Sequence, residues 1–179
     1  SFSDNIMVER NGYKLIPAKL SLDAYKFALD GDWIVRSYSV TVAVVVIGTL
    51  LSIVISSMLA YAISVKTLKY RNTIALYCFL TMIINVGLVP WYLVLRKYYG
   101  FGDSIWSLII PYLVNPWYIF LLRNYFESIP DSMSESARID GAGTITIYSR
   151  IILPLSTPIL ATVSLFIALA YWNDWWLAL

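Results

Sequence analysis

Histidine is absent from the 179 residues, and cysteine occurs once, as Cys78. The missing histidine excludes Ser-His-Asp and Cys-His catalytic triads, the HExxH zinc helix and histidine proton relays. A single cysteine inside an apolar segment gives no basis for a disulfide framework or a cysteine metal site. The sequence also lacks GxxxxGK[ST], the loop that cradles nucleotide phosphates. We therefore expect no catalytic residues, metal or cofactor on this chain.

Charge is also scarce, with 13% charged residues and a mean hydropathy of +0.70. A soluble domain of this size could not bury so much apolar surface in one core. Four segments are long and apolar enough to cross a bilayer, which takes roughly 20 residues. They are 33–65, with only Arg36 charged; 72–95 and 104–122, both uncharged; and 151–179, with only Asp174. The sequence predicts an all-α, polytopic transmembrane helical bundle.

The two ends differ from the middle of the chain. Residues 1–32 mix both signs of charge with Asn11-Gly12 and Pro17, and we expect a small extracytoplasmic segment there. Residues 33–179 form the predicted transmembrane domain. The chain begins without Met and stops inside the apolar run 175–179, so we expect a fragment of a longer protein.

Basic residues predict the orientation. Lys66, Lys69 and Arg71 form the densest basic cluster in a short loop, and the positive-inside rule places that loop in the cytoplasm. The loop 123–153 then lies on the same side, while 1–32 and 96–103 lie outside. Arg96 and Lys97 argue mildly against this order.

Small residues recur every fourth position in the first span, which lets another helix approach closely. They are Gly48, Ser52, Ser56, Ala60 and Ser64. Ordinary helix packing and a sliding surface between moving halves both fit this stripe. Prolines 90, 111 and 116 should kink or break the next two spans, where Asn85 and Asn115 can satisfy freed backbone groups. Such breaks either line a path or are inert.

The loop 123–153 is long, polar and patterned. Pro130 fits the first turn of a helix over 130–140, Asp131 suits its positive end, and Gly141 can end it in a left-handed conformation. Ile129, Met133 and Ala137 would form its apolar stripe. A second helical stretch, 144–153, should stop at Pro154.

Three short motifs in this region resemble the cytoplasmic "EAA" loop of binding-protein-dependent ABC importer permeases. They are Glu135-Ser136-Ala137, Asp140-Gly141-Ala142 and Ile152-Leu153-Pro154 with Pro158. The surroundings Phe120–Phe126 and Trp172-Asn173-Asp174 are similar to the carbohydrate branch of this family, which is related to the second maltose permease subunit. The segments 11–13 and 20–25 are similar to the complex-polysaccharide members of that branch. Ser136 departs from the usual alanine.

The resemblance implies a type I ABC importer permease fold with six spans, of which the first and last would be missing. It implies a multi-pass subunit of the bacterial cell membrane that imports an oligosaccharide or complex glycan. The implied partners are a second permease in a heterodimer, two cytoplasmic ATPase subunits that bind ATP and Mg, and an extracytoplasmic solute-binding protein. The net charge of +2 gives no indication of nucleic-acid binding.

The loop helix would then be a coupling helix that fits into a groove of the moving ATPase and conveys its displacement to the spans. The candidate coupling residues are Met133, Glu135, Ser136, Ala137, Ile139, Asp140, Gly141 and Ala142. Glu135 would meet a basic group of the ATPase, and the apolar residues would supply contact area. The alternative is a merely amphipathic surface helix.

The candidate translocation path consists of Asn85, Asn115, Trp172, Asn173 and Asp174. A carboxylate at membrane depth needs a water-filled cavity or a polar partner, so Asp174 either borders the path or fixes the interface with the other permease. The tryptophans fit an interfacial belt or stacking on sugars.

Two other classes compete with this interpretation. A secondary transporter or channel driven by an ion gradient usually places several ionisable groups inside the membrane, whereas these spans contain Arg36 and Asp174. A membrane enzyme or assembly factor is disfavoured by the missing histidine and the few acidic residues within the spans.

Overall fold

The computed structural model describes residues 32–84, 87, 93–94, 97 and 104–174. These residues form helices and turns, with no strand among them. The predictions for 1–31, Asn85, Pro90 and the loop 96–103 lie outside the described residues, apart from Lys97. The chain divides into two compact units, residues 1–41 and 42–179.

The first span is one continuous helix, α3 (Asp32–Ser64). At 1.5 Å per residue its 33 residues extend about 50 Å, more than a hydrocarbon core requires. Among the described residues it is the one single helix that meets the length and hydropathy requirements of a span. α4 (Arg71–Ile83) follows after a short turn. Beyond α4, the predicted span 72–95 is described only at residues 84, 87 and 93–94.

The third predicted span is broken where its prolines lie. α6 (Ile105–Ile109) continues into the 3-10 helix η2 (Ile110–Tyr112), which holds Pro111, and α7 (Pro116–Ser128) begins at the second proline. The two halves bend by 47°. The Asn115 side chain accepts a hydrogen bond from the Trp117 amide at 2.9 Å, so it satisfies a backbone group freed at the break, as predicted.

The loop region contains both predicted helical stretches, and the second is divided into three elements. α8 (Asp131–Ile139) is followed by α9 (Thr144–Ile147), the π-helix η3 (Tyr148–Ile152), α10 (Leu153–Leu155) and α11 (Thr157–Trp172). The last two bodies, Thr144–Leu155 and α11, meet at 81°.

Two proline predictions need correction. Pro130 is the N-cap residue of α8 and not part of its first turn. Its ψ of 130° is extended rather than helical, so the helix begins at Asp131. Pro154 does not stop the second stretch but lies inside α10, where the preceding π-helix replaces the regular hydrogen-bond ladder that a proline would disrupt. The chain turns instead at Ser156.

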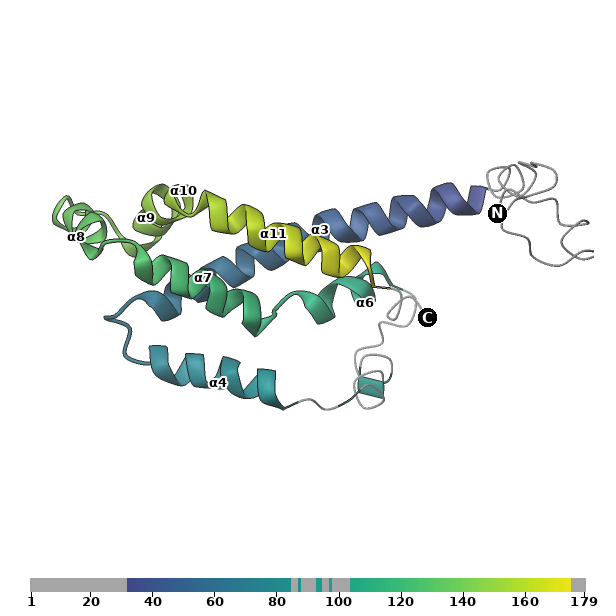
Figure 1. Cartoon of the computed structure of the whole chain (residues 1–179), viewed down its shortest axis with the longest axis horizontal. Coiled ribbons are helices and arrows are strands. Elements are labelled where there is room, and N and C mark those ends of the chain that lie inside the picture. The colour runs from purple at the N-terminus through teal and green to yellow at the C-terminus, as the bar shows by residue number, and fades with distance from the viewer. Residues whose placement is uncertain (1–31, 85–86, 88–92, 95–96, 98–103, 175–179) are drawn as a thin grey trace, which may run out of the picture. The chain divides into compact units, whose positions relative to one another are not determined.

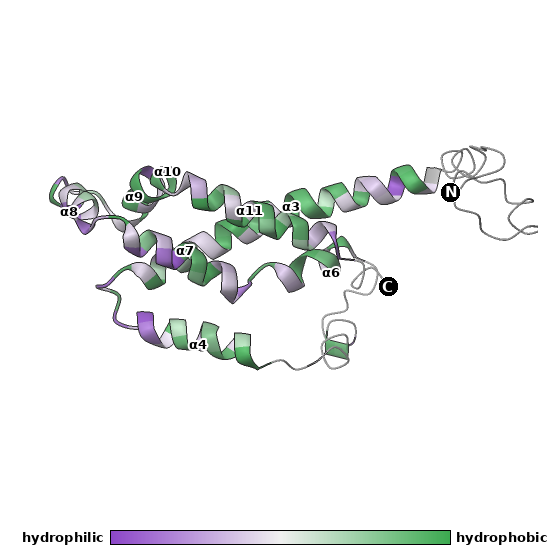
Figure 2. Cartoon of the chain, viewed as in Figure 1, coloured by the Kyte–Doolittle hydropathy of each residue, from purple (hydrophilic) through white to green (hydrophobic). Residues whose placement is uncertain are grey.

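Within the second unit, Figure 1 shows α8, α9 and α10 at the same end as the turn between α3 and α4. α7 packs between α4 and α11. This arrangement agrees with the predicted order, in which the loops 66–71 and 123–153 lie on one side. Figure 2 shows α8 as largely hydrophilic and α11 as largely apolar.

The stripe of small residues on α3 is buried. Ser52, Ser56 and Ala60 have no exposed surface, Gly48 is buried, and Ser64 is half-buried. The Ser52 hydroxyl donates to the Leu113 carbonyl at 2.8 Å, at the break between η2 and α7. Close helix packing along this stripe is therefore what the structure shows, while sliding along it stays a prediction.

The closest approach along α3 is at Gly48. A Cβ built on Gly48 would lie 2.6 Å from Cζ of Tyr171. The Tyr171 ring cannot retreat freely, because its hydroxyl donates to the Ile109 carbonyl at 2.9 Å and its face meets Tyr112 edge-on at 5.8 Å. Glycine at 48 is thus required by the crossing of α3 and α11.

Gly48→Ala should destabilise the bundle by about 1–3 kcal/mol, the usual cost of overpacking a tight core. The measurement is the midpoint of thermal unfolding of the full-length protein in detergent. Gly143→Ala is the matched control, since a Cβ there meets nothing within 4 Å. An unchanged midpoint for Gly48→Ala would show that α11 is not held against α3 as described.

Candidate functional site at the coupling loop

α8 has well-defined ends. Asp131 lies in its first turn and Arg138 in its last, so each charge complements the helix dipole. At the C-terminus Gly141 has φ +82°, as predicted. Its amide donates to the Arg138 carbonyl at 3.0 Å, and the Ala142 amide donates to the Ala137 carbonyl at 2.9 Å. This pair of bonds is a Schellman motif, which ends a helix in a fixed geometry.

The candidate coupling residues divide by exposure. Glu135, Ser136, Asp140 and Gly141 are exposed, whereas Ala137 and Ala142 are half-buried. Met133 and Ile139 have 46% and 87% of their surface exposed. Of the predicted apolar stripe, Ile129 and Ala137 are half-buried, whereas Met133 is exposed to solvent.

A further exposed apolar residue was missed by the sequence analysis. Ile145 on α9 is 82% exposed, close in sequence to the exposed Ile139. The available signal was an isoleucine between two threonines directly after a Gly-Ala-Gly turn, where apolar periodicity gives no reason for burial. Large exposed apolar residues on a polar loop indicate a protein contact or a lipid contact.

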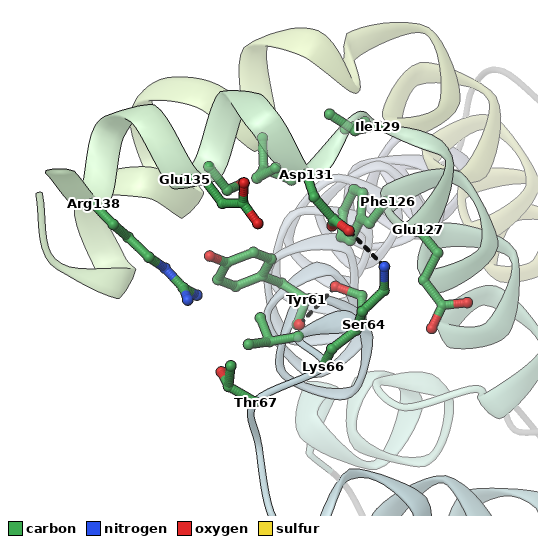
Figure 3. Close-up of a pocket in the computed structure, with 13 residues that line it drawn as sticks. Tyr61, Ser64, Lys66, Thr67, Phe126, Glu127, Ile129, Asp131, Glu135 and Arg138 are labelled. Atoms are coloured by element: carbon green, nitrogen blue, oxygen red, sulfur yellow. Dashed lines mark hydrogen bonds and ion pairs between the residues drawn. The ribbon is translucent and has the colours of Figure 1, made fainter.

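A cleft of about 140 Å³ lies between α8 and the end of α3. Figure 3 shows side chains entering it from α3, the following turn, α7 and α8. Its lining residues are Tyr61, Ser64, Val65, Lys66, Thr67, Phe126, Glu127, Ile129, Asp131, Ser134, Glu135, Arg138 and Ile152. Four charged residues of the loop 123–153 thus line this cleft: Glu127, Asp131, Glu135 and Arg138.

An ion pair closes one side of this cleft. The Lys66 ammonium donates to Oδ2 of Asp131 at 2.5 Å, across 65 residues of sequence. The hydrogen bond to Asp131, and then the charge of that carboxylate, raises the pKa of Lys66 above its ordinary value. Both side chains are about two thirds exposed, so solvent screens the pair strongly. The contact connects the first turn of α8 to the end of α3, which no local sequence pattern could indicate.

The side chain of Glu135 is exposed to solvent. Glu127, on the α7 wall of the cleft, pairs with Arg123 at 3.0 Å. In the part of the chain that the structure describes, no cation lies within ion-pair distance of Glu135. An exposed carboxylate can accept a hydrogen bond from a cationic side chain of another protein.

The candidate path residues that the structure describes lie at or near the ends of helices. Asn115 caps α7, and the Asn173 side chain donates to the Leu169 carbonyl at 2.8 Å. Trp172 is half-exposed. Asp174 is half-buried and lies near Tyr112 of η2. Whether these residues border a path stays a prediction.

Among the described residues there is no group of three His, Cys, Asp or Glu side chains that could hold a metal ion.

The family described as binding-protein-dependent transport system inner membrane component matches residues 52–178. The chain belongs to this family. The matched range includes α8 and the loop around it.

Relatives in this family include sugar permeases. The polygalacturonan/rhamnogalacturonan transport system permease protein YtcP of Bacillus subtilis is 41% identical over the whole chain and 62% of its own length. The alpha-glucoside transport system permease protein AglG of Rhizobium meliloti is 34% identical over 88% of this chain and 44% of its own length. The chain thus spans between 44% and 62% of the length of these relatives.

A solved structure confirms the predicted fold. The crystal structure of a bacterial ABC transporter involved in the import of the acidic polysaccharide alginate is similar with a TM-score of 0.86 and 32% identity. The match covers 97% of this chain and 61% of that one. The chain therefore has the all-α fold of an ABC importer permease, and it is a transport component.

Gly141→Val should loosen the end of α8, because a side chain at φ +82° costs about 1–2 kcal/mol and a β-branched one more. Hydrogen exchange at the backbone amides of residues 141 and 142 should accelerate by about tenfold or more. Gly143→Val is the control, because residue 143 has φ −70° and open space around it. Equal exchange in both variants would contradict the assigned role of Gly141.

Proposed function

We propose that this chain is the membrane-spanning subunit of an ATP-driven, binding-protein-dependent carbohydrate importer, with α8 as its coupling helix. The observation that carries the proposal is α8 itself, a short helix with fixed ends that presents Glu135, Met133 and Ile139 to solvent. Family membership and the likeness to an alginate importer support it. ATP and Mg would bind to a separate ATPase subunit.

The coupling step would proceed through contact between α8 and that ATPase. A groove on the ATPase would receive Met133 and Ile139, and a cation in it would pair with Glu135. Closure of the ATPase around ATP would displace α8 together with α9 and α10. The spans would then exchange inward-facing and outward-facing arrangements around the substrate.

The substrate class would be an oligosaccharide or complex glycan. Support comes from relatives whose names specify polygalacturonan/rhamnogalacturonan and alpha-glucosides, and from the structure of an alginate importer. Trp172, Asn173 and Asp174 at the end of α11 would offer a flat ring and hydrogen bonds to such a molecule.

The remaining partners follow from the same proposal. The chain would form a heterodimer with a second permease, bind two cytoplasmic ATPase subunits, and receive substrate from an extracytoplasmic solute-binding protein. It would lie as a multi-pass protein in the bacterial cell membrane. Support comes from the apolar side chains that α3 and α4 expose, among them Leu50, Val54 and Phe79, which suit lipid or a partner helix.

Glu135→Lys should lower both ATPase association and ATP-driven uptake by at least about tenfold, because it replaces an attraction with a repulsion of about 1.4 kcal/mol or more. Membrane insertion should survive, since residue 135 is exposed. The measurements are ATPase copurified per permease and uptake into proteoliposomes containing the full complex.

Glu127→Lys is the control for this experiment, because it reverses a carboxylate on the α7 wall of the same cleft. It should retain most of the ATPase. Normal uptake in Glu135→Lys, or equal losses in the two variants, would remove Glu135 from the proposed contact.

The path assignment of Asp174 is tested by thiol labelling. With Cys78 replaced by serine, a cysteine at position 174 should react with a water-soluble thiol reagent in at least one transport state. The physical reason is that a half-buried carboxylate at membrane depth is stable beside water or a polar partner. Protection in every state, with normal labelling at an exposed control position such as Ser132→Cys, would place residue 174 away from the path.

A further inference from the structure

The coupling loop contacts α3 at a second place, deeper than the Lys66–Asp131 ion pair. The hydroxyl oxygen of Tyr148, in the π-helix η3, lies 2.7 Å from Oγ of Ser57 on α3. Ser57 is almost fully buried, with 2% of its surface exposed. These two residues are separated by 91 positions in the chain.

The direction of this hydrogen bond follows from the donors available. The Ser57 hydroxyl has one hydrogen, which it donates to the Val54 carbonyl at 3.0 Å. Tyr148 is therefore the donor and Ser57 the acceptor. Removal of the Tyr148 hydroxyl would leave Ser57 with its bond to Val54, so the loss would not strand a buried donor.

The ring of Tyr148 adds a second contact with the same helix. Its centroid lies 5.2 Å from that of Tyr61, one turn further along α3, with 31° between the planes. Tyr61 also lines the cleft beneath α8, where Figure 3 shows it between Arg138 and Ser64. Ile147, directly before η3, and Ile152, at its far end, are both buried and hold η3 in place. The tyrosine is thus fixed at both its ring and its hydroxyl.

We infer that Tyr148 is a positioning residue that fixes the coupling segment to α3, so that displacement of α8 reaches α3 as well as α11. This inference rests on the proposed coupling function of α8. α8 joins η3 through the rigid turn at Gly141 and the short helix α9, so movement of α8 is delivered to Tyr148. The hydrogen bond and the ring contact then transmit it to Ser57 and Tyr61.

The ion pair between Lys66 and Asp131 has a smaller part in this connection. Both of its side chains are exposed and screened by solvent, whereas Ser57 is buried and the Tyr148 ring is half-buried. The contact that is shielded from water holds its geometry better when the loop is displaced. Tyr148 rather than Lys66 is therefore the residue to test.

The test uses Tyr148→Phe in the full-length permease, assembled with its ATPase and solute-binding protein in proteoliposomes. The variant keeps the ring contact and removes one hydrogen bond. We expect substrate transported per ATP hydrolysed to fall about fivefold, the factor that corresponds to one neutral hydrogen bond. ATPase copurification and the KM for the loaded binding protein should stay unchanged. A merely destabilising change would lower transport and hydrolysis together and leave their ratio intact.

Two further variants sharpen the test. Tyr77→Phe removes the hydroxyl of an exposed tyrosine on α4 and should leave the ratio unchanged. Ser57→Ala should lower the ratio by itself but add nothing to Tyr148→Phe, because both remove the same bond. A wild-type ratio in Tyr148→Phe, or independent effects of the two substitutions, would overturn this inference alone. Absence of ATP-driven uptake in the wild-type complex would overturn the proposed function and this inference with it.

Discussion

The small, buried face of α3 determines how the rest of the described bundle is arranged. Gly48 admits the Tyr171 ring at the end of α11, Ser52 binds the broken span at Leu113, and Ser57 accepts from Tyr148 in η3. Lys66, just past the helix, pairs with Asp131 of α8. α3 and the turn after it therefore contact the break at Leu113, the loop elements η3 and α8, and the last span. Small side chains make this possible, since lipid-embedded helices associate through close packing more than through a hydrophobic driving force.

Breaks in the spans leave backbone groups without helical partners, and side chains satisfy them. Asn115 accepts from the Trp117 amide, Tyr171 donates to the Ile109 carbonyl, and Tyr125 donates to the Leu155 carbonyl near the 81° turn. In an apolar environment an unsatisfied backbone group costs several kcal/mol. These bonds therefore fix the bends, and the bends in turn set where α8 and the end of α11 lie.

The sequence predicted local features well because local chemistry determines them. Long uncharged runs predicted α3, prolines predicted the break before α7, and Gly141 predicted the left-handed end of α8. The π-helix at Tyr148–Ile152 was missed, and Pro154 was wrongly expected to end the second stretch, because the π-helix changes the hydrogen-bond ladder in which the proline lies. Contacts between residues far apart in the chain, such as Ser57 with Tyr148, depend on the assembled packing and have no periodic signature.

The fixed ends of α8 have a consequence for how movement would pass through the loop. A helix that frayed at either end would absorb a displacement by local unwinding. Here the Met133 amide donates to the Pro130 carbonyl at 3.2 Å in the first turn, where Asp131 complements the helix dipole, and the Schellman bonds of Gly141 and Ala142 hold the last turn. α8 would therefore move as one body, and the next element able to yield is the chain at Ser156, between α10 and α11. Tyr148 lies between α8 and that bend, so the displacement of α8 would reach α3 before it reaches α11. The bend at Ser156 would then determine how much of the displacement passes to α11.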